Sequence, residues 1–405
     1  MTDVVVPRAE DFDDIAGLLA LAFHGGLDPE LLEVERGIFE PERGLLVRDG
    51  TTAVAHAAAF TRELGVPGAS VPAAHVTMVS VAPTHRRRGL LTTLMRRQLR
   101  EIRDAGREPI AVLWASEGRI YPRFGYGLAA QRLSVSCDTT ELRLPEPASA
   151  AGTLRLDRPA ARQDELARLY DRVRADRPGW SNRDERWWRY VVADVKSLRA
   201  GATERRVLLH EGPAGLDGYA LFRTKDEWDR GGPRGEVRVD EVVAENPDAY
   251  LALWRLLLTI DLTRKLSAPL AVDEPLLWLV NEPRRLGAQL TDGLWVRVVD
   301  LPAALAARRY ATDLDVVLDV TDELLPENAG RWRLVGDPSR ATCAATTEPA
   351  QLACDVRALG ELYLGGTGLG ALAAAGRVRE LVPGTLAAAG PAFGWHRAPA
   401  PMEVF

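Results

Sequence analysis

Apolar and polar positions follow an α/β pattern over the first 145 residues. Amphipathic helices are predicted from Asp11 to about Ala22 and from about Gly89 to Ala105, where apolar side chains recur every three or four residues. A short helix is expected from Ile120 to Phe124. Apolar runs predict strands at Val4 to Val6, Gly44 to Arg48, Thr52 to Phe60, Ala74 to Val81 and Ile110 to Trp114. Strands that alternate with helices in this way predict an α/β domain.

A second α/β pattern follows the linker-like segment from Pro145 to Gly152. Helices are predicted from about Gln163 to Arg174 and from Pro247 to about Leu262. The predicted strands are Thr153 to Leu156, Arg206 to His210, Gly218 to Arg223 and Glu236 to Val243. Because the elements come in the same order as in the first domain, the sequence indicates an internal duplication.

The pattern changes again after Leu294 and predicts a third, α+β domain. Its expected helices are Pro302 to Tyr310, Leu369 to Ala375 and one around Leu381. Its expected strands are Trp295 to Val299, Asp313 to Val320, Arg331 to Leu334 and Glu361 to Leu364. The last residues include Trp395, Pro399, Pro401 and Phe405, more apolar anchors than a frayed terminus needs. We therefore expect domains at 1–147, 148–292 and 293–405.

Composition narrows the class of protein. The chain has 405 residues, of which 46% are hydrophobic and 27% charged, as in a folded globular protein. Its 51 Lys and Arg residues against 57 Asp and Glu residues give a formal net charge of −6, which argues against nucleic-acid or anionic-membrane partners. The N-terminal residues lack the basic region and long apolar region typical of a signal peptide, and we expect no membrane span because no apolar run reaches about 18 residues. Three cysteines without metal-ligand spacing predict neither a disulfide framework nor a metal site, and favour a cytoplasmic setting.

One loop combines features that favour an anion. The predicted strand that includes Val79, Ser80 and Val81 leads through Ala82-Pro83-Thr84-His85 into Arg86, Arg87, Arg88 and Gly89, where the next helix opens with Leu90, Leu91 and Thr92. Free backbone N–H groups and the positive end of the helix dipole would attract a diphosphate, and glycine allows close approach. Charge alone favours a different interpretation of the loop, a solvated arginine turn or a nucleic-acid patch.

Two motifs together decide between these interpretations. Arg86 and Gly89 match the acetyl-coenzyme A signature of GNAT acetyltransferases, which this loop resembles, although Leu91 replaces the usual small residue. The later segment Tyr121-Pro122-Arg123-Phe124-Gly125-Tyr126 resembles the Tyr-x-x-x-Gly-aromatic motif that closes a GNAT domain. A tyrosine on a short helix is otherwise usually a packing residue.

With Ala115-Ser116-Glu117-Gly118-Arg119 preceding Tyr121, the whole chain resembles the enhanced intracellular survival (Eis) family of GNAT N-acetyltransferases. The resemblance implies tandem GNAT domains, the second degenerate, and a C-terminal domain similar to sterol carrier protein 2. It implies acetyl-CoA as co-substrate, a small-molecule amine as acceptor and a homo-oligomer, a hexamer in the family. Acetyl-CoA would contact residues 79–81 and 86–92 together with Ser116 and Glu117.

The resemblance also implies catalytic roles. Tyr121 would protonate the leaving thiolate, Tyr126 would be the packing aromatic, and the terminal carboxylate of Phe405 would act as the base. The second domain has the acidic Glu245 and Asp248 where a diphosphate would bind, so we expect no cofactor there.

Other candidates rest on position alone. Asp28, Glu30 and Glu403 could favour a cationic amine, and His24 could line the same pocket, whereas His85 is expected to pack inside the loop. The run from Gly365 to Gly370 lacks the last glycine of GxGxxG and is interpreted as a tight strand-to-helix turn. The leading function is acetyl-CoA-dependent N-acetyl transfer to a polycationic amine, such as an aminoglycoside, or to lysine. The alternative is a lipid-binding or regulatory protein with a vestigial acetyltransferase core.

Overall fold

The computed structural model describes residues 3–146 and 152–405. The chain forms two compact units. The first contains the N-terminal domain up to Ala130, the short segment Asp176–Asn182, and everything from Asp292 to Phe405. The second contains Gln131–Ala175 and Arg183–Thr291.

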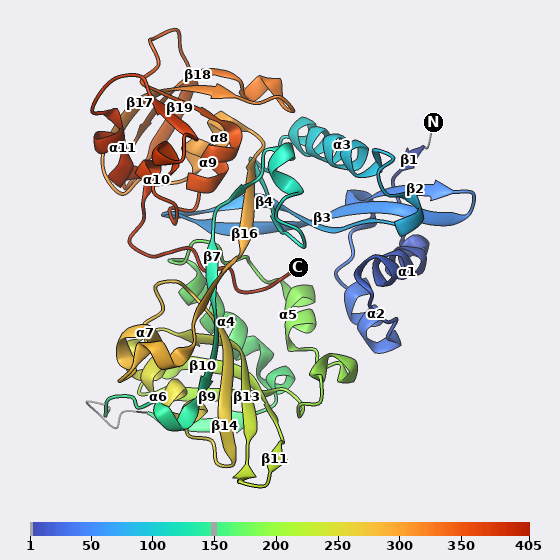
Figure 1. The fold of residues 1–405 in the computed structure, drawn as a ribbon, viewed down its shortest axis with the longest axis vertical. Helices are drawn as coiled ribbons and strands as arrows, with labels where there is room; N and C mark the ends of the chain where they lie inside the picture. The colour runs from blue at the N-terminus through green and yellow to red at the C-terminus, as the bar shows by residue number, and fades with distance from the viewer. Residues whose placement is uncertain (1–2, 147–151) are drawn as a thin grey trace. The chain divides into compact units, whose positions relative to one another are not determined.

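A seven-stranded sheet organises the N-terminal domain, in the order β1-β2-β3-β4-β5-β16-β6 (Figure 1). Its helices are α1 (Phe12–Phe23), α2 (Pro29–Arg36) and α3 (Leu90–Ala105). The strands are β1 (Val4–Val5), β2 (Leu45–Asp49), β3 (Thr52–Val66), β4 (Ala69–Val81), β5 (Ile110–Trp114), β16 (Leu294–Val298) and β6 (Gly127–Leu128). The predicted α/β pattern is confirmed, with β3 and β4 longer than expected because they form one hairpin.

Helix α3 shows why the periodic pattern was informative. Its apolar face buries Leu94, Met95, Leu99 and Ile102, and at its C-terminus Gly106 adopts the left-handed conformation with φ of 64°. Such a C-terminal glycine satisfies the last helical carbonyls without a Cβ clash. The helix therefore ends at Gly106, and its N-terminus meets the end of β4 through the arginine loop.

One expected strand belongs to a different sheet. The sequence pattern placed the strand beginning at Trp295 in the third domain, but β16 pairs antiparallel with β5 along its whole length and with β6 on its other side. Its side chains are all buried, as a central strand requires. The assignment was wrong because periodicity identifies a strand but not its neighbours.

The C-terminal domain is a five-stranded sheet with four helices. The sheet has the order β19-β18-β17-β20-β21. Its strands are β17 (Leu314–Thr321), β18 (Gly330–Gly336), β19 (Ala341–Ala345), β20 (Leu352–Asp355) and β21 (Val378–Glu380). Its helices are α8 (Leu301–Ala307), α9 (Val356–Leu362), α10 (Leu369–Ala374) and α11 (Thr385–Phe393).

Two predictions for this domain were wrong. Residues Glu361 to Leu364, expected as a strand, lie at the end of α9 and just beyond it, because Asp355 caps the helix by accepting from the Ala358 N–H at 2.8 Å. The region around Leu381, expected as a helix, separates β21 from α11. The glycine run at 365–370 consequently joins two helices instead of a strand and a helix.

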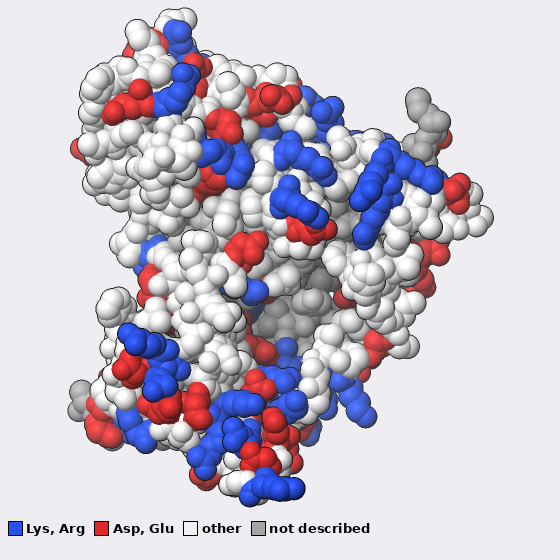
Figure 2. All heavy atoms as spheres, viewed as in Figure 1, with Lys and Arg blue, Asp and Glu red and all other residues white. Residues whose placement is uncertain are grey.

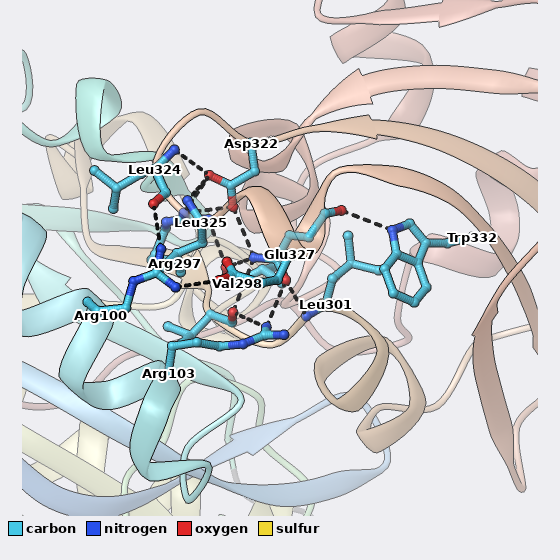
Figure 3. A network of polar contacts seen from close by, with 12 residues as sticks. Arg100, Arg103, Arg297, Val298, Leu301, Asp322, Leu324, Leu325, Glu327 and Trp332 are labelled. Carbon is cyan, nitrogen blue, oxygen red and sulfur yellow. Dashed lines mark hydrogen bonds and ion pairs between the residues drawn. The ribbon is translucent and has the colours of Figure 1, made fainter.

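A buried polar network joins this domain to the N-terminal one (Figure 3). Arg297 on β16 donates to both carboxylate oxygens of Asp322 at 2.8 Å, and Asn328 donates to Asp322 at 2.9 Å. From α3, Arg103 donates to Asn328 Oδ1 at 3.0 Å and to the Val299 carbonyl at 2.7 Å. Fully buried charges are stable only when paired in this way. The network therefore fixes β16 and α3 to the C-terminal domain.

The second unit repeats the α/β order around its own seven-stranded sheet, β15-β7-β14-β13-β10-β9-β8. The main helices are α4 (Gln163–Arg174), α5 (Glu185–Val192), α6 (Pro247–Leu258) and the short α7 (Leu276–Leu279). The strands of the sheet are β7 (Gln131–Asp138), β8 (Thr153–Asp157), β9 (Arg206–Gly212), β10 (Gly215–Lys225), β13 (Gly235–Ala244), β14 (Thr263–Leu270) and β15 (Gln289–Asp292). Strands β11 (Trp228–Asp229) and β12 (Gly232–Pro233) form a small ribbon.

Within residues 3–146 and 152–405, no helix is both long and apolar enough to cross a bilayer. The same residues contain no group of three or more His, Cys, Asp or Glu side chains arranged to hold a metal ion.

Candidate active site

Strands β4 and β5 separate at the centre of the first sheet. They pair in parallel only at Ala73 with Ile110, Ala74 with Ala111 and His75 with Val112. Beyond these pairs β4 continues to Val81, whereas the other edge of β5 pairs with β16 up to Trp114. The facing edges of the two strand ends are therefore left without a strand partner in the described residues. Such an opening at the carboxyl ends of parallel strands can admit a ligand between the strands.

A β-bulge in β4 marks the start of this opening. The register between β3 and β4 shifts between the pairs His56 with Ser80 and Ala58 with Thr77. Met78 and Val79 on β4 therefore both lie opposite a single residue of β3, Ala57. Met78 has a φ of 52°, which non-glycine residues rarely adopt. Bulges of this kind redirect backbone groups away from the ladder, and they concentrate near active sites.

The arginine loop leads from the end of β4 to the N-terminus of α3. Arg86, Arg87 and Arg88 are exposed, and none of them makes an ion pair with another described residue. Figure 2 shows basic side chains gathered over the region of α3. Gly89 occupies the cap position with a φ of 82°, and no described side chain caps the helix. The first-turn N–H groups and three free guanidinium groups thus remain available to an anion.

In the second unit, the helix that corresponds to α3 begins differently. There α6 is capped by its own Asn246, whose side chain accepts from the Ala249 N–H at 2.9 Å. Glu245 pairs with Arg172 of α4, with one contact at 3.1 Å. The equivalent helix end is thus satisfied by its own side chain and carries negative charge. That this domain binds no cofactor stays a prediction.

Ser116 and Glu117 follow β5 and are both exposed. Glu117 forms an ion pair with Arg119 at 2.9 Å. They lie after the strand end that flanks the opening, which is where the sequence placed them. Their contact with a cofactor stays a prediction.

Tyr121 and Tyr126, in the segment that follows β5, pack against each other. Their ring centroids are 5.9 Å apart and the ring planes make an angle of 72°. Burial, together with the negative charge of Glu117, raises the pKa of Tyr121 to about 12. Its hydroxyl is therefore protonated at neutral pH, as a general acid must be. Tyr126 is fully buried, as expected for the packing aromatic.

The C-terminal tail returns to the N-terminal domain. Figure 1 shows it in red, running from α11 to the C-terminus. The tail is held first by segment 176–182, where Arg397 pairs with Asp176 at 3.2 Å and the Ala400 N–H donates to the Pro178 carbonyl at 2.9 Å. That segment in turn is bonded to β3, since the Gly65 N–H donates to the Trp180 carbonyl at 2.7 Å.

The final residues contact β3 and β4 directly. Glu403 forms an ion pair with Arg62 of β3, whose side chain is 1% exposed. The ring of Phe405 lies 4.6 Å from that of His75 on β4, measured between centroids. His75 belongs to the last pair before β4 and β5 separate. The chain therefore ends beside the start of the opening.

No sequence pattern predicts the contacts that hold the tail in place. Gly365 and Gly366 are needed because a Cβ at these positions would lie 2.9 Å from the Trp395 Cβ and 2.7 Å from the Pro399 Cγ. His75 is held by Ser181 at 2.7 Å and by the Ala73 carbonyl at 2.9 Å. Apart from Ala73, these partners are distant in sequence, so no local motif could reveal them.

The structure gives other roles to several positional candidates. Asp28 caps α2 by accepting from the Glu30 N–H at 2.8 Å, and Glu30 is exposed in the first turn of that helix. His24 ends α1 in the left-handed conformation with φ of 59°. His85 contacts Asp49 at 3.2 Å, and Glu403 is engaged by Arg62. That any of these residues lines an acceptor pocket stays a prediction.

Comparisons with known proteins agree with this geometry. Models described as acetyltransferase (GNAT) domains match residues 6–129 and 179–298, and a sterol carrier protein domain matches 301–401. A Streptomyces avermitilis protein called an uncharacterized N-acetyltransferase is 46% identical over 98% of both chains. The N-acetyltransferase Eis of Mycobacterium tuberculosis is 36% identical over 92% of both chains.

The chain belongs to the Eis family of N-acetyltransferases. The crystal structure of Eis1 from Mycobacterium abscessus superposes with a TM-score of 0.85 at 33% identity and covers 100% of both chains. Tandem GNAT domains followed by a sterol-carrier-like domain are therefore the family architecture, and the enzyme class is GNAT-type acetyltransferase. In this Eis-family chain, the opening between β4 and β5 is the candidate active site, and acetyl-CoA is the co-substrate that the GNAT fold implies.

Proposed function

We propose that this chain transfers the acetyl group of acetyl-CoA to a primary amine of a polycationic small molecule, such as an aminoglycoside, or of a lysine side chain. The observation that carries the proposal is the combination of the β4–β5 opening with the uncapped, arginine-flanked N-terminus of α3. The opening suits a thioester and the helix end suits a diphosphate. One ligand that contains both groups accounts for the two features together.

Different residues would bind different parts of acetyl-CoA. Arg86 to Arg88, Gly89 and the first-turn N–H groups of Leu90 to Thr92 would hold the pyrophosphate. Backbone groups of Val79 to Val81 would face the thioester, where an N–H stabilises the negative charge that develops on the carbonyl oxygen. Ser116 and Glu117 would border the cofactor from β5.

Transfer needs a new C–N bond and the loss of the C–S bond. The amine nitrogen attacks the thioester carbonyl carbon directly, and the departing sulfur takes the phenolic proton of Tyr121. A pKa of about 12 keeps that proton in place until sulfur becomes basic. Solvent then restores the proton to Tyr121.

The proton of the attacking amine would pass to the terminal carboxylate of Phe405, directly or through a water. A terminal carboxyl has an ordinary pKa of about 3.3–3.7 and is by itself a weak base. The contact of the Phe405 ring with His75 supports the assignment because it holds the chain end beside the opening. The family resemblance further suggests a hexamer, which light scattering would test.

The binding step can be tested with a pair of glycines on α3. Gly89 and Gly106 both have positive φ, 82° and 64°, and a Cβ at either would meet nothing within 4 Å. Ala at each position carries a similar backbone strain of about 1 kcal/mol. We expect Gly89→Ala to raise the KM for acetyl-CoA by about tenfold or more, equivalent to about 1.4 kcal/mol of binding.

Gly106→Ala is the matched control and should leave that KM unchanged. Coenzyme A release would be followed with aminoglycosides, polyamines and lysine peptides as acceptors. Equal KM values in the two variants would contradict the placement of the pyrophosphate. Absence of turnover with every amine would contradict the proposed acceptor class.

A further inference from the structure

His56 is a buried histidine that takes no part in the proposed binding of acetyl-CoA or in the proposed proton transfers. It lies on β3, directly opposite Ser80 of β4, and its side chain is fully buried. Its Nδ1 lies 3.1 Å from the carbonyl oxygen of Met78, the bulge residue with positive φ. The imidazole is therefore bonded to the one backbone unit that departs from the regular ladder.

The protonation state of the ring follows from its surroundings. Burial lowers the pKa of His56 to about 4, so the ring is neutral at pH 7 and carries one N–H. A carbonyl oxygen can only accept, which places that hydrogen on Nδ1. The hydrogen bond to Met78 is thus permanent over the physiological pH range.

Core packing does not explain this side chain. Within the described residues, neither Nε2 of His56 nor the hydroxyl of Ser80 has a hydrogen-bond partner. Leaving a buried polar atom unpartnered costs about 1–3 kcal/mol, a cost that an apolar side chain would avoid. What the histidine supplies, and an apolar residue would not, is the Nδ1 hydrogen bond to the bulge.

Peptide geometry gives this bond a consequence. The carbonyl of Met78 and the N–H of Val79 belong to one planar trans peptide unit, so they point in opposite directions. The carbonyl points toward His56 on β3. The Val79 N–H must then point away from the imidazole, and the neighbour of β4 on the side opposite β3 is the separated end of β5.

We propose that His56 is a positioning residue for acetyl transfer: its Nδ1–H holds the Met78 carbonyl and thereby aims the Val79 N–H at the thioester carbonyl oxygen. The inference rests on the proposed function, since it assumes that acetyl-CoA binds in the β4–β5 opening. A hydrogen bond to the carbonyl also polarises the peptide and makes its N–H a better donor. The contribution grows as charge develops on the thioester oxygen, so it acts on kcat more than on KM.

Two substitutions of similar size separate the hydrogen bond from the packing. In His56→Asn the amide nitrogen can take the place of Nδ1, whereas in His56→Gln the donor lies one bond further along the side chain. We expect H56N to keep kcat within about threefold of wild type and H56Q to lose about tenfold or more, a part of the 10²–10³ that loss of a whole oxyanion donor costs. The KM for acetyl-CoA should change little in either variant.

A spectroscopic readout does not depend on the acceptor. Infrared spectroscopy of bound acetyl-CoA labelled with ¹³C at the thioester carbonyl reports the hydrogen bond directly, because the bond lowers the stretching frequency. H56N should keep the wild-type frequency, and H56Q should move it toward the value in water-free solvent. Gln98→Leu is the control, since both amide atoms of the buried Gln98 lack hydrogen-bond partners in the described residues and the residue lies on α3, not on the bulged strand.

The outcomes are distinct. Equal kcat values and equal carbonyl frequencies in wild type, H56N and H56Q would overturn the role of His56. Equal losses in H56N and H56Q, with Q98L unaffected, would overturn it as well, because packing alone would then explain the effect. If wild type binds acetyl-CoA but acetylates no amine, the proposed function fails while the infrared comparison still tests His56.

Discussion

Tyr121 and Tyr126 lie edge to face, yet their hydroxyl groups have different surroundings. The Tyr126 hydroxyl is buried without a hydrogen-bond partner in the described residues, and burial raises its pKa far above the ordinary value. Tyr121 lies at the end of the segment that follows β5, and its pKa of about 12 also reflects the charge of Glu117. Only Tyr121 therefore combines a retained proton with a place next to the strand end.

Replacing Tyr121 by Phe removes the proton donor and leaves the ring packing intact. We expect kcat to fall by about 10²–10⁴, the usual contribution of a general acid, with the KM for acetyl-CoA little changed. Tyr126→Phe is the control, because its hydroxyl makes no bond that the substitution could break. Steady-state coenzyme A release measures both. A Tyr121→Phe enzyme with wild-type kcat would contradict the assigned acid.

His56 and His75, two buried histidines of the N-terminal domain, predict that the protein becomes less stable as the pH falls. Burial lowers the pKa of His56 to about 4, and burial with the positive charge of Arg62 lowers that of His75 to about 3, from 6.5. As the pH falls below 6.5, these histidines become protonated in the unfolded chain but stay neutral in the folded protein. Each histidine should then reduce the free energy of unfolding by about 2 kcal/mol between pH 7 and pH 5.

Thermal unfolding of wild type and His56→Asn at pH 7, 6 and 5 measures this effect. The variant should lose less stability than wild type as the pH falls, because it lacks one titrating group. Identical pH dependence in the two proteins would contradict the buried, neutral state of His56. Both histidines were missed at the sequence level, since their partners Met78 and Ser181 lie 22 and 106 residues away.

At the level of elements, the sequence predicted what periodicity and local motifs control. Strand β5 and helix α3 have nearly the expected bounds, and the spacing of Arg86, Gly89 and Tyr121 identified the family. Predictions failed where tertiary contacts decide. Strand β16 looked like the first strand of a new domain, because nothing local shows that β5 and β6 lie on either side of it. Residues Glu361 to Leu364 looked like a strand, although Asp355 had already started a helix.

The buried network of Figure 3 yields a prediction about element docking. Asp322→Asn leaves the Arg297 guanidinium, which is 0% exposed, without its countercharge. Breaking one partner of a buried pair costs about 3–5 kcal/mol. We therefore expect calorimetry to show a lower temperature for the first unfolding transition. We also expect reduced activity, because the Arg297 side chain packs against Gly125, which precedes Tyr126.

Asp315→Asn provides the matched control in the same domain. Asp315 pairs with Arg333 at 2.8 Å, but the two side chains are 53% and 44% exposed. An exposed pair contributes at most about 1 kcal/mol. Equal effects of the two substitutions would contradict the view that the Arg297–Asp322 pair joins the domains.

At the scale of the whole molecule, three remote stretches of sequence build the candidate site. Strands β3 and β4 supply Arg62 and His75, segment 176–182 supplies Ser181 and the Pro178 carbonyl, and the tail supplies Glu403 and Phe405. The apolar residues of the tail suggested that it is anchored, but its route could not be predicted. This arrangement explains how Phe405 is held beside the candidate active site.

We propose that the terminal carboxylate of Phe405 completes the acetyltransferase site. The most direct measurement is coenzyme A release from acetyl-CoA with the amine panel, for wild type and for the chain that lacks Phe405. The account predicts turnover by wild type and a large loss in the deletion, with acetyl-CoA still bound, since residues 86–92 are unchanged. Wild-type turnover in the deletion would contradict the terminal base, and absence of turnover by wild type with every amine would contradict the proposed reaction.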